Sequence, residues 1–581
     1  MRASEPIPAD DAANRACPHS LNDSPYPSLM QAASAMATDT ATSSGIADLK
    51  QESSHEERLE VANHTAVKAW SVLNKMWYPD YHMASFAGWM GVPGGLCYHN
   101  GLYHVFYQYN PFSENWGPMH WGHVTSEDLV HWQHQPIALA PGELFDHDGC
   151  FSGSSVSYNN KLYIFYTGHT WRTESEKGSG NGAMGEGASF YQQQCVAVSS
   201  DGVNFEKLGA VVRPPPGYVH FRDPKVWQQD GRWWMVCGAR DVTKDLGQLL
   251  LFATEDLLKW DDTNWQVLGM TEDKNVFMWE CPDLFRLDQM DVFLYSPQGM
   301  RKAGYANRNR FQSGYLLGSW NTSLVTVALS EREALSPKDT ASGGHAVDGP
   351  RWLTSFDVTQ RFREIDRGHD FYAPQTLPTK DGRRLIIGWM DMWESPMPTR
   401  GHGWSGCLTL PRELILDPFT GSVRMVPPKE LLQLRCAQAT ISAQRIQEST
   451  DVLLVEDCTA YELDIAFNME TSTAEKYGLW LGSGAELYVD AQSKRLVLNR
   501  HYPQHMLSGY RSCEMPTGLL LQLHVFIDRS SIEVFVNNGE ATFSSRVFPD
   551  EGDRALRVFS VNGTADMVGG TMWKLKATVR H

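Results

Sequence analysis

The stretch GLYHVFYQYN (residues 101–110) decides the fold, because strands of the same kind recur along the chain. Each copy is a short run rich in aromatic and β-branched residues beside Gly, Asn or Asp, which is typical of β-strands bounded by turns. The further copies are KLYIFYTGH (161–169), GRWWMVCGAR (231–240), DVFLYSPQG (291–299) and GRRLIIGWMD (382–391). Five similar strands indicate five repeats of one structural unit.

A second recurring segment follows several of these strands and combines a strand, a Ser/Thr-Asp turn and an aromatic residue. Its copies are VTSEDLVHW (124–132), AVSSDGVNF (197–205) and FATEDLLKW (252–260). The two segments together resemble successive hairpins of one blade. Five such units predict an all-β fold with a five-bladed β-propeller over residues 77–430, whose central funnel gathers loops from every blade. Chance recurrence of similar strands is the alternative.

The regions outside the repeats predict three further parts. Residues 1–55 are rich in Ala, Ser, Thr, Asp and Pro, which is typical of a disordered tail. Residues 56–76 have apolar positions at mostly helical spacing and predict one amphipathic helix. Residues 431–581 predict a β-sandwich, because LQLHVFIDRSSIEVFVNNGEATFSSRVFP (521–549) alternates around an Asn-Gly hairpin turn. PPKELLQLR (427–435) is the expected connector.

The composition indicates a globular chain without nucleic-acid or membrane partners. The 581 residues contain 50 Lys and Arg against 68 Asp and Glu, which gives a net charge of −18. Such an excess repels phosphate backbones and anionic membranes, and no apolar run reaches the roughly 18 residues of a membrane span. The N-terminus has no apolar segment of the secretory type, so we expect a cytoplasmic protein.

The cysteines and histidines do not predict a metal site. The ten cysteines are scattered, without the CxxC or CxxC…HxxxH spacing of zinc ligands, and most are expected to be reduced and buried. His120 and His123 in WGPMHWGH (116–123) also lack a metal-ligand spacing, so packing in the core or at the rim is expected of them. The sequence therefore supports no metal, nucleotide or redox cofactor.

Two carboxylates lie in aromatic, strand-like segments. Glu280 in FMWECPDLF (277–285) follows Trp279, and its expected desolvation suits a general acid. Asp223 in HFRDPKVW (220–227) follows Arg222, which would keep it ionised. The alternatives are a surface glutamate at a strand end and a structural Arg-Asp pair.

Aromatic side chains near these segments point to a sugar ligand. The residues are Trp116, Trp121, Trp389 and Tyr372. Taken singly, each is expected more often in a blade core than on a ligand platform. Together with amides and carboxylates they suit a sugar, because ring faces stack on aromatic planes while hydroxyls need polar partners.

Several segments resemble glycoside hydrolase family 32, the family of invertases, fructanases and bacterial sucrose hydrolases. The resemblance runs from about residue 57 to the end and is strongest to the bacterial intracellular sucrose hydrolases. It rests on WGPMHWGHVTSEDLVHWQHQPIALAPGE (116–143), DGCFSGS (148–154), HFRDPKVW, MWECPDLF, HDFYAPQ (369–375), IGWMDMWESPMP (387–398) and FIDRSSIEVFVNNGE (526–540). It implies a five-bladed propeller followed by a β-sandwich, and cleavage of a terminal β-fructofuranosyl unit with retention of configuration, as in sucrose hydrolysis to glucose and fructose.

The resemblance also implies roles for single residues. Glu280 would be the acid/base, and Asp223, beside Arg222, would hold fructose hydroxyls and stabilise the transition state. The residues that would line the sugar pocket are Trp89, Met90, Gly91, Gln108, Trp116, Phe151, Ser152, Arg222, Asp223, Glu280, Tyr372 and Trp389.

The chain departs from the family at the nucleophile. The family motif is WMNDPNG, whereas residues 89–95 read WMGVPGG, so Val92 stands where the nucleophilic aspartate is expected. Retaining hydrolysis needs two carboxyl groups about 5 to 5.5 Å apart, and valine cannot attack a sugar. The nearest carboxylate before Val92 is that of Asp80, while Asp146 and Asp148 belong to the DGCFSGS region.

Three hypotheses follow from this departure. The chain is a sucrose hydrolase by descent with severely impaired activity, or it is a non-catalytic protein that binds or senses fructosides. The third hypothesis is direct attack by water with inversion, which needs a general base and a carboxyl separation of about 6.5 to 9.5 Å. The sequence offers no candidate for that base.

Overall fold

The computed structural model describes residues 53–172, 189–270, 273, 275–318 and 362–578, and most of these residues lie in strands. Residues from His55 onward form one unit, which contains all the strands described below. The tail expected over residues 1–55 lies almost wholly outside the described residues.

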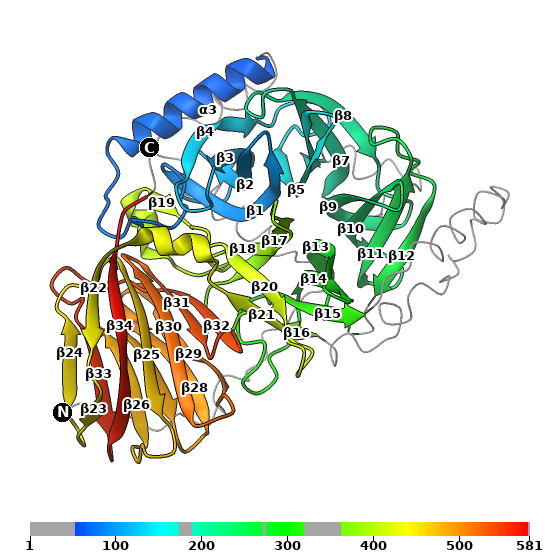
Figure 1. The fold of residues 1–581 in the computed structure, drawn as a ribbon. Helices are drawn as coiled ribbons and strands as arrows, with labels where there is room; N and C mark the ends of the chain where they lie inside the picture. Colours follow the sequence, from blue (N-terminus) through cyan, green and yellow to red (C-terminus); the bar gives the residue numbers. More distant parts are fainter. Residues whose placement is uncertain (1–52, 173–188, 271–272, 274, 319–361, 579–581) are drawn as a thin grey trace. The chain divides into compact units, whose positions relative to one another are not determined.

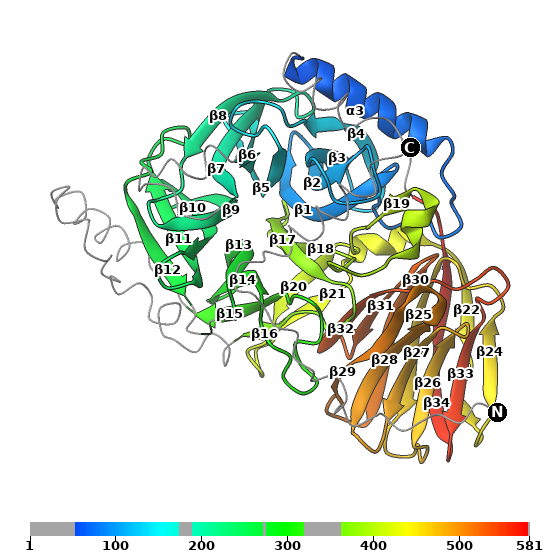
Figure 2. The same cartoon turned by 180° about the vertical axis from the view of Figure 1, so that it is seen from behind.

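Five sheets surround a central axis, and each is one blade of a propeller (Figures 1 and 2). The first blade has β1 (Gly88–His99), β2 (Leu102–Asn110), β3 (His120–Ser126) and β4 (Gln133–Leu139), and the second has β5 (Gly149–Tyr158), β6 (Lys161–Trp171), β7 (Phe190–Ser199) and β8 (Glu206–Val212). The third has β9 (Tyr218–Gln229), β10 (Arg232–Asp241), β11 (Leu246–Thr254) and β12 (Trp265–Met270). The fourth has β13 (Met278–Leu287), β14 (Met290–Gln298), β15 (Gly314–Gly318) and β16 (Arg363–Glu364), and the fifth has β17 (Tyr372–Pro378), β18 (Arg384–Trp389), β20 (Arg412–Leu416) and β21 (Val423–Val426). The prediction of a five-bladed propeller is therefore confirmed.

Tight turns explain why the recurring strands form hairpins. Asn100-Gly101 joins β1 to β2 with φ of 48° and 88°, and Asp230-Gly231 joins β9 to β10 with φ of 52° and 77°. Asn159-Asn160 joins β5 to β6 with φ of 49° and 58°. Positive φ at both turn residues matches the twist of the flanking strands, and Asn, Asp and Gly tolerate it best.

A short strand closes the ring: in sequence it falls among the strands of the last blade, but it pairs with the first blade. β19 (Trp404–Ser405) lies between β18 and β20 in sequence, yet it pairs in parallel with β1 through Gly88↔Trp404 and Trp89↔Ser405. The η2 turn (Pro398–His402) precedes it, and Gly88 N donates to Gly403 O at 3.0 Å. Because this pairing joins the first and last blades, it fixes the inner end of β1 within the funnel.

Helix α3 (His55–Trp70) covers the outer strand of the first blade (Figure 1). Ala62 and Ala66 are buried, and Asn63 Oδ1 accepts a hydrogen bond from Ile137 N of β4 at 3.0 Å. The helix expected over residues 56–76 corresponds to α3, but the prediction was too long at the C-terminal end, because α3 ends at Trp70. The reason is that the chain turns after Trp70 and Asn74 N donates to His402 O at 3.3 Å.

The C-terminal region is a β-sandwich of two antiparallel sheets (Figure 2). One sheet holds β22 (Arg435–Ile441), β23 (Gln444–Ile446), β25 (Tyr461–Asn468), β30 (Leu520–Asp528), β31 (Ser531–Val536), β32 (Ala541–Arg546) and β34 (Ala565–Leu575). The other holds β24 (Asp451–Val455), β26 (Lys476–Leu481), β27 (Ala485–Asp490), β28 (Arg495–Tyr502), β29 (Leu507–Glu514) and β33 (Leu556–Val561), with the η4 turn (Pro503–His505) before β29. The η3 turn (Lys429–Leu434) leads from the propeller into β22. The predicted sandwich is confirmed.

Candidate active site

The funnel is formed by the first strand of each blade. β1, β5, β9, β13 and β17 contact one another in turn, and β17 contacts β1 again. Val92, Ser152, Asp223, Glu280 and Tyr372 lie in the first half of these five strands. The structure therefore brings one expected site residue from every blade to the same end of the ring.

Each of the five strands has a β-bulge at these positions. The register shifts lie between Met90 and Pro93, Phe151 and Gly153, Arg222 and Lys225, Glu280 and Asp283, and Tyr372 and Gln375. Asp223, Cys281 and Ala373 have φ of 62°, 48° and 45°, a region that non-glycine residues seldom adopt. A bulge re-aims side chains that would otherwise follow the strand alternation, so the bulges orient the site residues into the funnel.

Glu280 is held by donors on both carboxylate oxygens. Its Oε1 accepts hydrogen bonds from Arg222 Nε at 3.1 Å and Nη2 at 2.7 Å. Its Oε2 accepts from Gln298 Nε2 at 2.9 Å and from the Tyr372 hydroxyl. Only 6% of Glu280 is exposed, so the alternative of a surface glutamate is wrong. The donors fix the orientation of one desolvated carboxyl group.

Asp223 lies beside this group. Its Oδ2 accepts a hydrogen bond from Cys281 N at 3.0 Å and lies 3.8 Å from Arg222 Nε, and its backbone N donates to Thr167 Oγ1 at 2.9 Å. Burial raises the pKa of Asp223 to about 6; Arg222 opposes this shift, whereas the negative charge of Glu280 adds to it. Arg222 thus favours the ionised form of Asp223, as expected, but it lies closer to Glu280 and does not cancel the effect of burial on the pKa.

Val92 lies in an apolar cluster at the position where a nucleophile is expected. The cluster includes Trp89, Phe151, Cys281 and Tyr372, and only 5% of Val92 is exposed. The ring of Trp89 occupies the space beside residue 91: a Cβ on Gly91 would lie 2.3 Å from Trp89 Cη2. The side chain of the family's first asparagine therefore has no room in this arrangement.

The other carboxylates considered from the sequence are engaged elsewhere. Asp80 accepts from Arg529 Nε at 3.0 Å. Asp146 is buried and accepts from Lys207 Nζ at 2.6 Å, and Asp148 accepts from Trp171 N at 2.8 Å. These contacts hold loops and strands together, and none of these carboxylates takes the place of the missing aspartate at position 92.

Gln108, Trp116 and Phe151 lie along one side of the funnel. Gln108 on β2 is buried next to Gly91, since a Cβ on Gly91 would lie 3.3 Å from Gln108 Cβ. The Trp116 and Phe151 rings pack edge to face with centroids 5.9 Å apart. Phe151 also stacks on His169 with centroids 4.3 Å apart. Ser152 is buried beside Phe151, and its carbonyl accepts from Thr167 Oγ1 at 3.3 Å.

Other aromatic residues belong to the framework of the blades. Trp389 is buried and its Nε1 donates to Met90 O at 2.9 Å, which ties the fifth blade to the first. Trp121 Nε1 donates to Phe151 O at 3.1 Å. His120 and His123 contact Pro118 O and His104 respectively, as expected of core or rim histidines.

Sequence reasoning missed Gln298, Thr167 and His220. Gln298 and Thr167 lie near the ends of the recurring strands DVFLYSPQG and KLYIFYTGH, where each contacts a motif residue of the neighbouring inner strand. His220 Nδ1 lies 3.1 Å from Arg222 Nη1. For Gln298 and Thr167, the available signal was a polar residue near the end of a recurring strand.

Within the described residues, no group of three or more His, Cys, Asp or Glu side chains is arranged to hold a metal ion. None of the helices in the described part of the chain is long and apolar enough to cross a membrane.

Comparisons with known proteins identify the family of both domains. The model of the glycosyl hydrolases family 32 N-terminal domain matches residues 82–427, and the family 32 C-terminal model matches residues 430–574. A sucrose-6-phosphate hydrolase of Escherichia coli is 45% identical over 520 residues, which cover 90% of this chain and 99% of the relative. A raffinose invertase of the same species is 44% identical over 519 residues, covering 89% and 99%.

Among solved structures, a mutant β-fructofuranosidase of Bombyx mori in complex with sucrose has a TM-score of 0.72 and 29% identity. The match covers 91% of this chain and 100% of that chain. The two family models and the relatives of 44–45% identity thus lead to one conclusion: this chain belongs to glycoside hydrolase family 32.

Proposed function

We propose that this chain is a β-fructofuranosidase that acts on sucrose or a related sugar with a terminal β-fructofuranosyl unit. The observation that carries the proposal is the buried Glu280 carboxyl group, held by Arg222, Gln298 and Tyr372 beside Asp223. Relatives that are hydrolases of sucrose 6-phosphate or raffinose, and a structural neighbour that contains sucrose, support the substrate class. The net charge of −18 mildly disfavours a phosphorylated substrate.

Two of the three catalytic roles have residues to fill them. Glu280 protonates the leaving-group oxygen and then deprotonates the water that completes hydrolysis. Asp223 accepts hydrogen bonds from fructose hydroxyls and stabilises positive charge that develops at the anomeric carbon. Both carboxyl groups are buried, and water exclusion strengthens these interactions.

The third role, nucleophilic attack, is unfilled, because position 92 holds valine. Removing a nucleophile from a catalytic group of this kind typically costs about 10⁴- to 10⁶-fold in rate. We therefore expect turnover to be slow. A second candidate function, non-catalytic binding of fructosides, is favoured by the same observation, because Val92 removes attack and leaves Asp223 and Glu280 available to hold sugar.

Glucose release from sucrose by the purified chain tests the proposal, with Glu280→Gln as the contamination control. Release above that control supports a β-fructofuranosidase, and the anomer of the first-formed fructose identifies retention or inversion. Calorimetric binding of sucrose without release supports the binding protein instead. The absence of both binding and release would contradict both functions.

A further inference from the structure

The bulge of β9 that carries Asp223 is held by side chains of the neighbouring second blade. In the described part of the chain, the register between β9 and β10 pairs Val219, Arg222 and Lys225 and skips the residues between them. Buried backbone groups outside a regular ladder need other hydrogen-bond partners. Asp223 also has φ of 62°, a conformation that persists only where the surrounding structure holds it.

Thr167 on β6 binds the backbone of Asp223. Its Oγ1 accepts a hydrogen bond from Asp223 N at 2.9 Å. The hydroxyl has one proton to donate, and the nearer of its two acceptors is Gln194 Oε1 at 2.9 Å, with Ser152 O at 3.3 Å. Thr167 is fully buried, so solvent water cannot replace its hydroxyl as the acceptor for Asp223 N.

Gln194 on β7 fixes the direction of these hydrogen bonds. It lies directly opposite Thr167 in the sheet and is fully buried as well. Its Nε2 donates to Phe221 O at 3.0 Å, and since a carbonyl oxygen can only accept, Oε1 is the atom that faces the Thr167 hydroxyl. The hydroxyl therefore donates to Gln194 and accepts from Asp223 N. A continuous chain of hydrogen bonds thus joins Phe221 O to Asp223 N through two side chains of the second blade.

Ser154 on β5 holds the other side of the bulge. Its Oγ donates to Pro224 O at 2.8 Å and accepts from Val226 N at 2.9 Å. With the two preceding side chains, the second blade thus binds four backbone groups of residues 221–226. These contacts leave the peptide group of Asp223 little freedom to rotate.

The orientation of this peptide group decides where the Asp223 carboxyl group lies. Its Oδ2 accepts from Cys281 N at 3.0 Å, on the strand that carries Glu280. Without an acceptor for Asp223 N, the backbone would relax from its positive φ and carry the carboxyl group away from Cys281 N. Displacement of a site residue by about 1 Å is enough to impair a binding or catalytic site.

We propose that Thr167 and Gln194 are positioning residues, which hold the Asp223 carboxyl group in the orientation that binds the fructosyl unit. The inference rests on the proposed function, because it assumes that Asp223 contacts fructose hydroxyls. The two residues act through the backbone of Asp223 and do not themselves contact the sugar.

Two substitutions at position 167 separate the hydrogen bond from packing. Thr167→Val keeps the size of the side chain and removes the hydroxyl, whereas Thr167→Ser keeps the hydroxyl and removes a methyl group. We expect Thr167→Val to weaken the binding of methyl β-D-fructofuranoside about tenfold in a calorimeter, and Thr167→Ser to stay within about twofold of the unaltered protein. A packing role predicts the reverse order.

Thr125→Val is the matched control. Thr125 lies on β3 of the first blade, is buried, and its Oγ1 accepts from Gln135 Nε2 at 2.9 Å. The substitution removes a buried hydroxyl of the same kind without touching a bulge, so it should leave the affinity for methyl β-D-fructofuranoside unchanged.

Hydrogen exchange measured by mass spectrometry follows the bulge without any sugar. Peptides that contain residues 221–226 should exchange faster in Thr167→Val than in Thr167→Ser or the unaltered protein, because Asp223 N loses its acceptor. Gln194→Leu should also accelerate this exchange and weaken sugar binding, because it frees Phe221 O and the Thr167 hydroxyl.

The outcomes separate the two proposals. Thr167→Val protein that binds methyl β-D-fructofuranoside as tightly as Thr167→Ser overturns the positioning role, and so does a loss that Thr125→Val shares. Weakened binding with unchanged exchange over residues 221–226 overturns it too. If the unaltered protein binds neither sucrose nor methyl β-D-fructofuranoside, the proposed function fails. Exchange then decides alone: acceleration in Thr167→Val supports the hold on Asp223, and equal rates in all variants overturn it.

Discussion

Position 92 and its neighbours show how a site can keep its framework and lose its reaction. The carboxyl group of Glu280 has partners on both oxygens, as a positioned acid requires. Across the funnel, a hydrocarbon side chain lies among aromatic rings, and Trp89 covers residue 91. The substitutions at 91 and 92 therefore act together, because the ring that covers Gly91 also packs in the cluster around Val92.

We expect Val92→Asp alone to recover little sucrose hydrolysis. The new carboxylate would enter an apolar cluster without the flanking amides, and burial without partners favours its neutral form. The triple change Gly91→Asn, Val92→Asp and Gly94→Asn should recover at least tenfold more, because Asn at 91 forces the Trp89 ring away. Initial rates of glucose release measure both proteins, and comparable rates would contradict this role of the asparagines.

Gln298→Leu in the triple variant should lower kcat about tenfold. Gln298 donates to Glu280 Oε2, and its loss leaves a buried carboxylate oxygen with one donor fewer, at a cost of about 1–3 kcal/mol. Gln266→Leu on the outer strand β12 is the matched control and should leave kcat unchanged. A pH profile of kcat distinguishes the roles, because loss of a donor to the carboxylate shifts the profile whereas a packing defect does not. An unshifted profile with unchanged kcat would remove Gln298 from the positioning of Glu280.

Among the elements, the inner strands of the blades position the site residues. The sequence predicts these strands and only some of their contacts. The strands themselves were predictable from GLYHVFYQYN and its copies, and so was the number of blades. The bulges also had a signal, because Pro93, Pro224, Pro282 and Pro374 interrupt four inner strands, and proline inside a sheet marks a bulge or an edge. The contacts of Gln298 with Glu280 and of His220 with Arg222 were not predictable, since they depend on how the bulges turn side chains within a blade. The end of α3 at Trp70 was not predictable either, because Asn74, just beyond it, contacts the distant His402.

Gly231→Ala in the turn between β9 and β10 should lower the melting temperature by about 1–3 °C. Gly231 has φ of 77°, and no atom lies within 4 Å of an added Cβ, so the cost comes from backbone conformation alone, about 1–2 kcal/mol. Gly401→Ala is the matched control: a Cβ there also meets nothing within 4 Å, and its φ lies outside the positive region. Equal melting temperatures of the two variants would show that the hairpin turn does not limit stability.

At the scale of the whole molecule, buried charges join the propeller to the sandwich. His82 Nδ1 contacts Asp528 Oδ2 at 2.8 Å and its Nε2 contacts Glu533 Oε1 at 2.9 Å, so both ring nitrogens face carboxylates. Arg412 bridges Glu533 and Asp366 with distances of 2.6 and 2.8 Å. This network was not evident from the sequence, because its members are separated by up to 451 residues.

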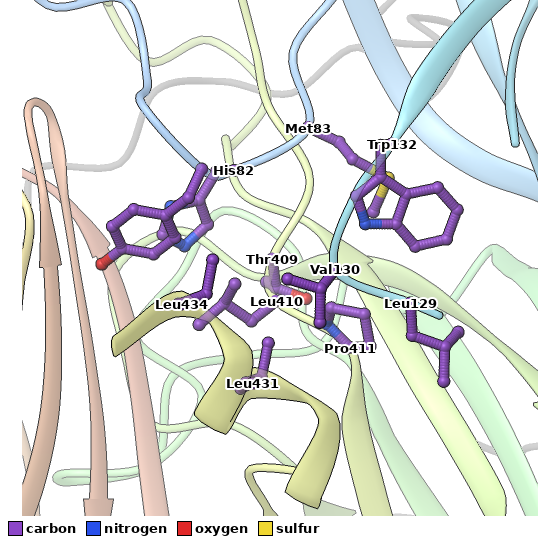
Figure 3. A pocket seen from close by; sticks show the side chains of 11 residues that line it. His82, Met83, Leu129, Val130, Trp132, Thr409, Leu410, Pro411, Leu431 and Leu434 are labelled. Carbon is purple, nitrogen blue, oxygen red and sulfur yellow. The ribbon is translucent and has the colours of Figure 1, made fainter. Parts of the chain in front are cut away.

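His82 also borders a small cavity at this junction (Figure 3). The cavity is lined mostly by apolar side chains of the propeller and of η3, such as Val130 and Leu431. The apolar surroundings exclude water from one side of the His82 ring, which strengthens its interaction with the two carboxylates. The charge of His82 therefore contributes to the interactions at the junction.

We expect the junction to weaken in alkaline solution. Burial alone would lower the pKa of His82, but its hydrogen bonds to Asp528 and Glu533 outweigh burial and raise the pKa to about 9. A raised pKa means that the folded state holds the proton more tightly, so the stabilisation is complete below about pH 6.5, the value for an unfolded histidine, and is lost as the pH rises through about 9. The melting temperature of the unaltered protein should therefore fall between pH 7 and pH 10 more steeply than that of His82→Gln, which carries no titrating ring. Tyrosines, lysines and cysteines titrate equally in both proteins, so the difference between the two curves isolates His82. Parallel curves over this range would contradict a charged histidine at the junction.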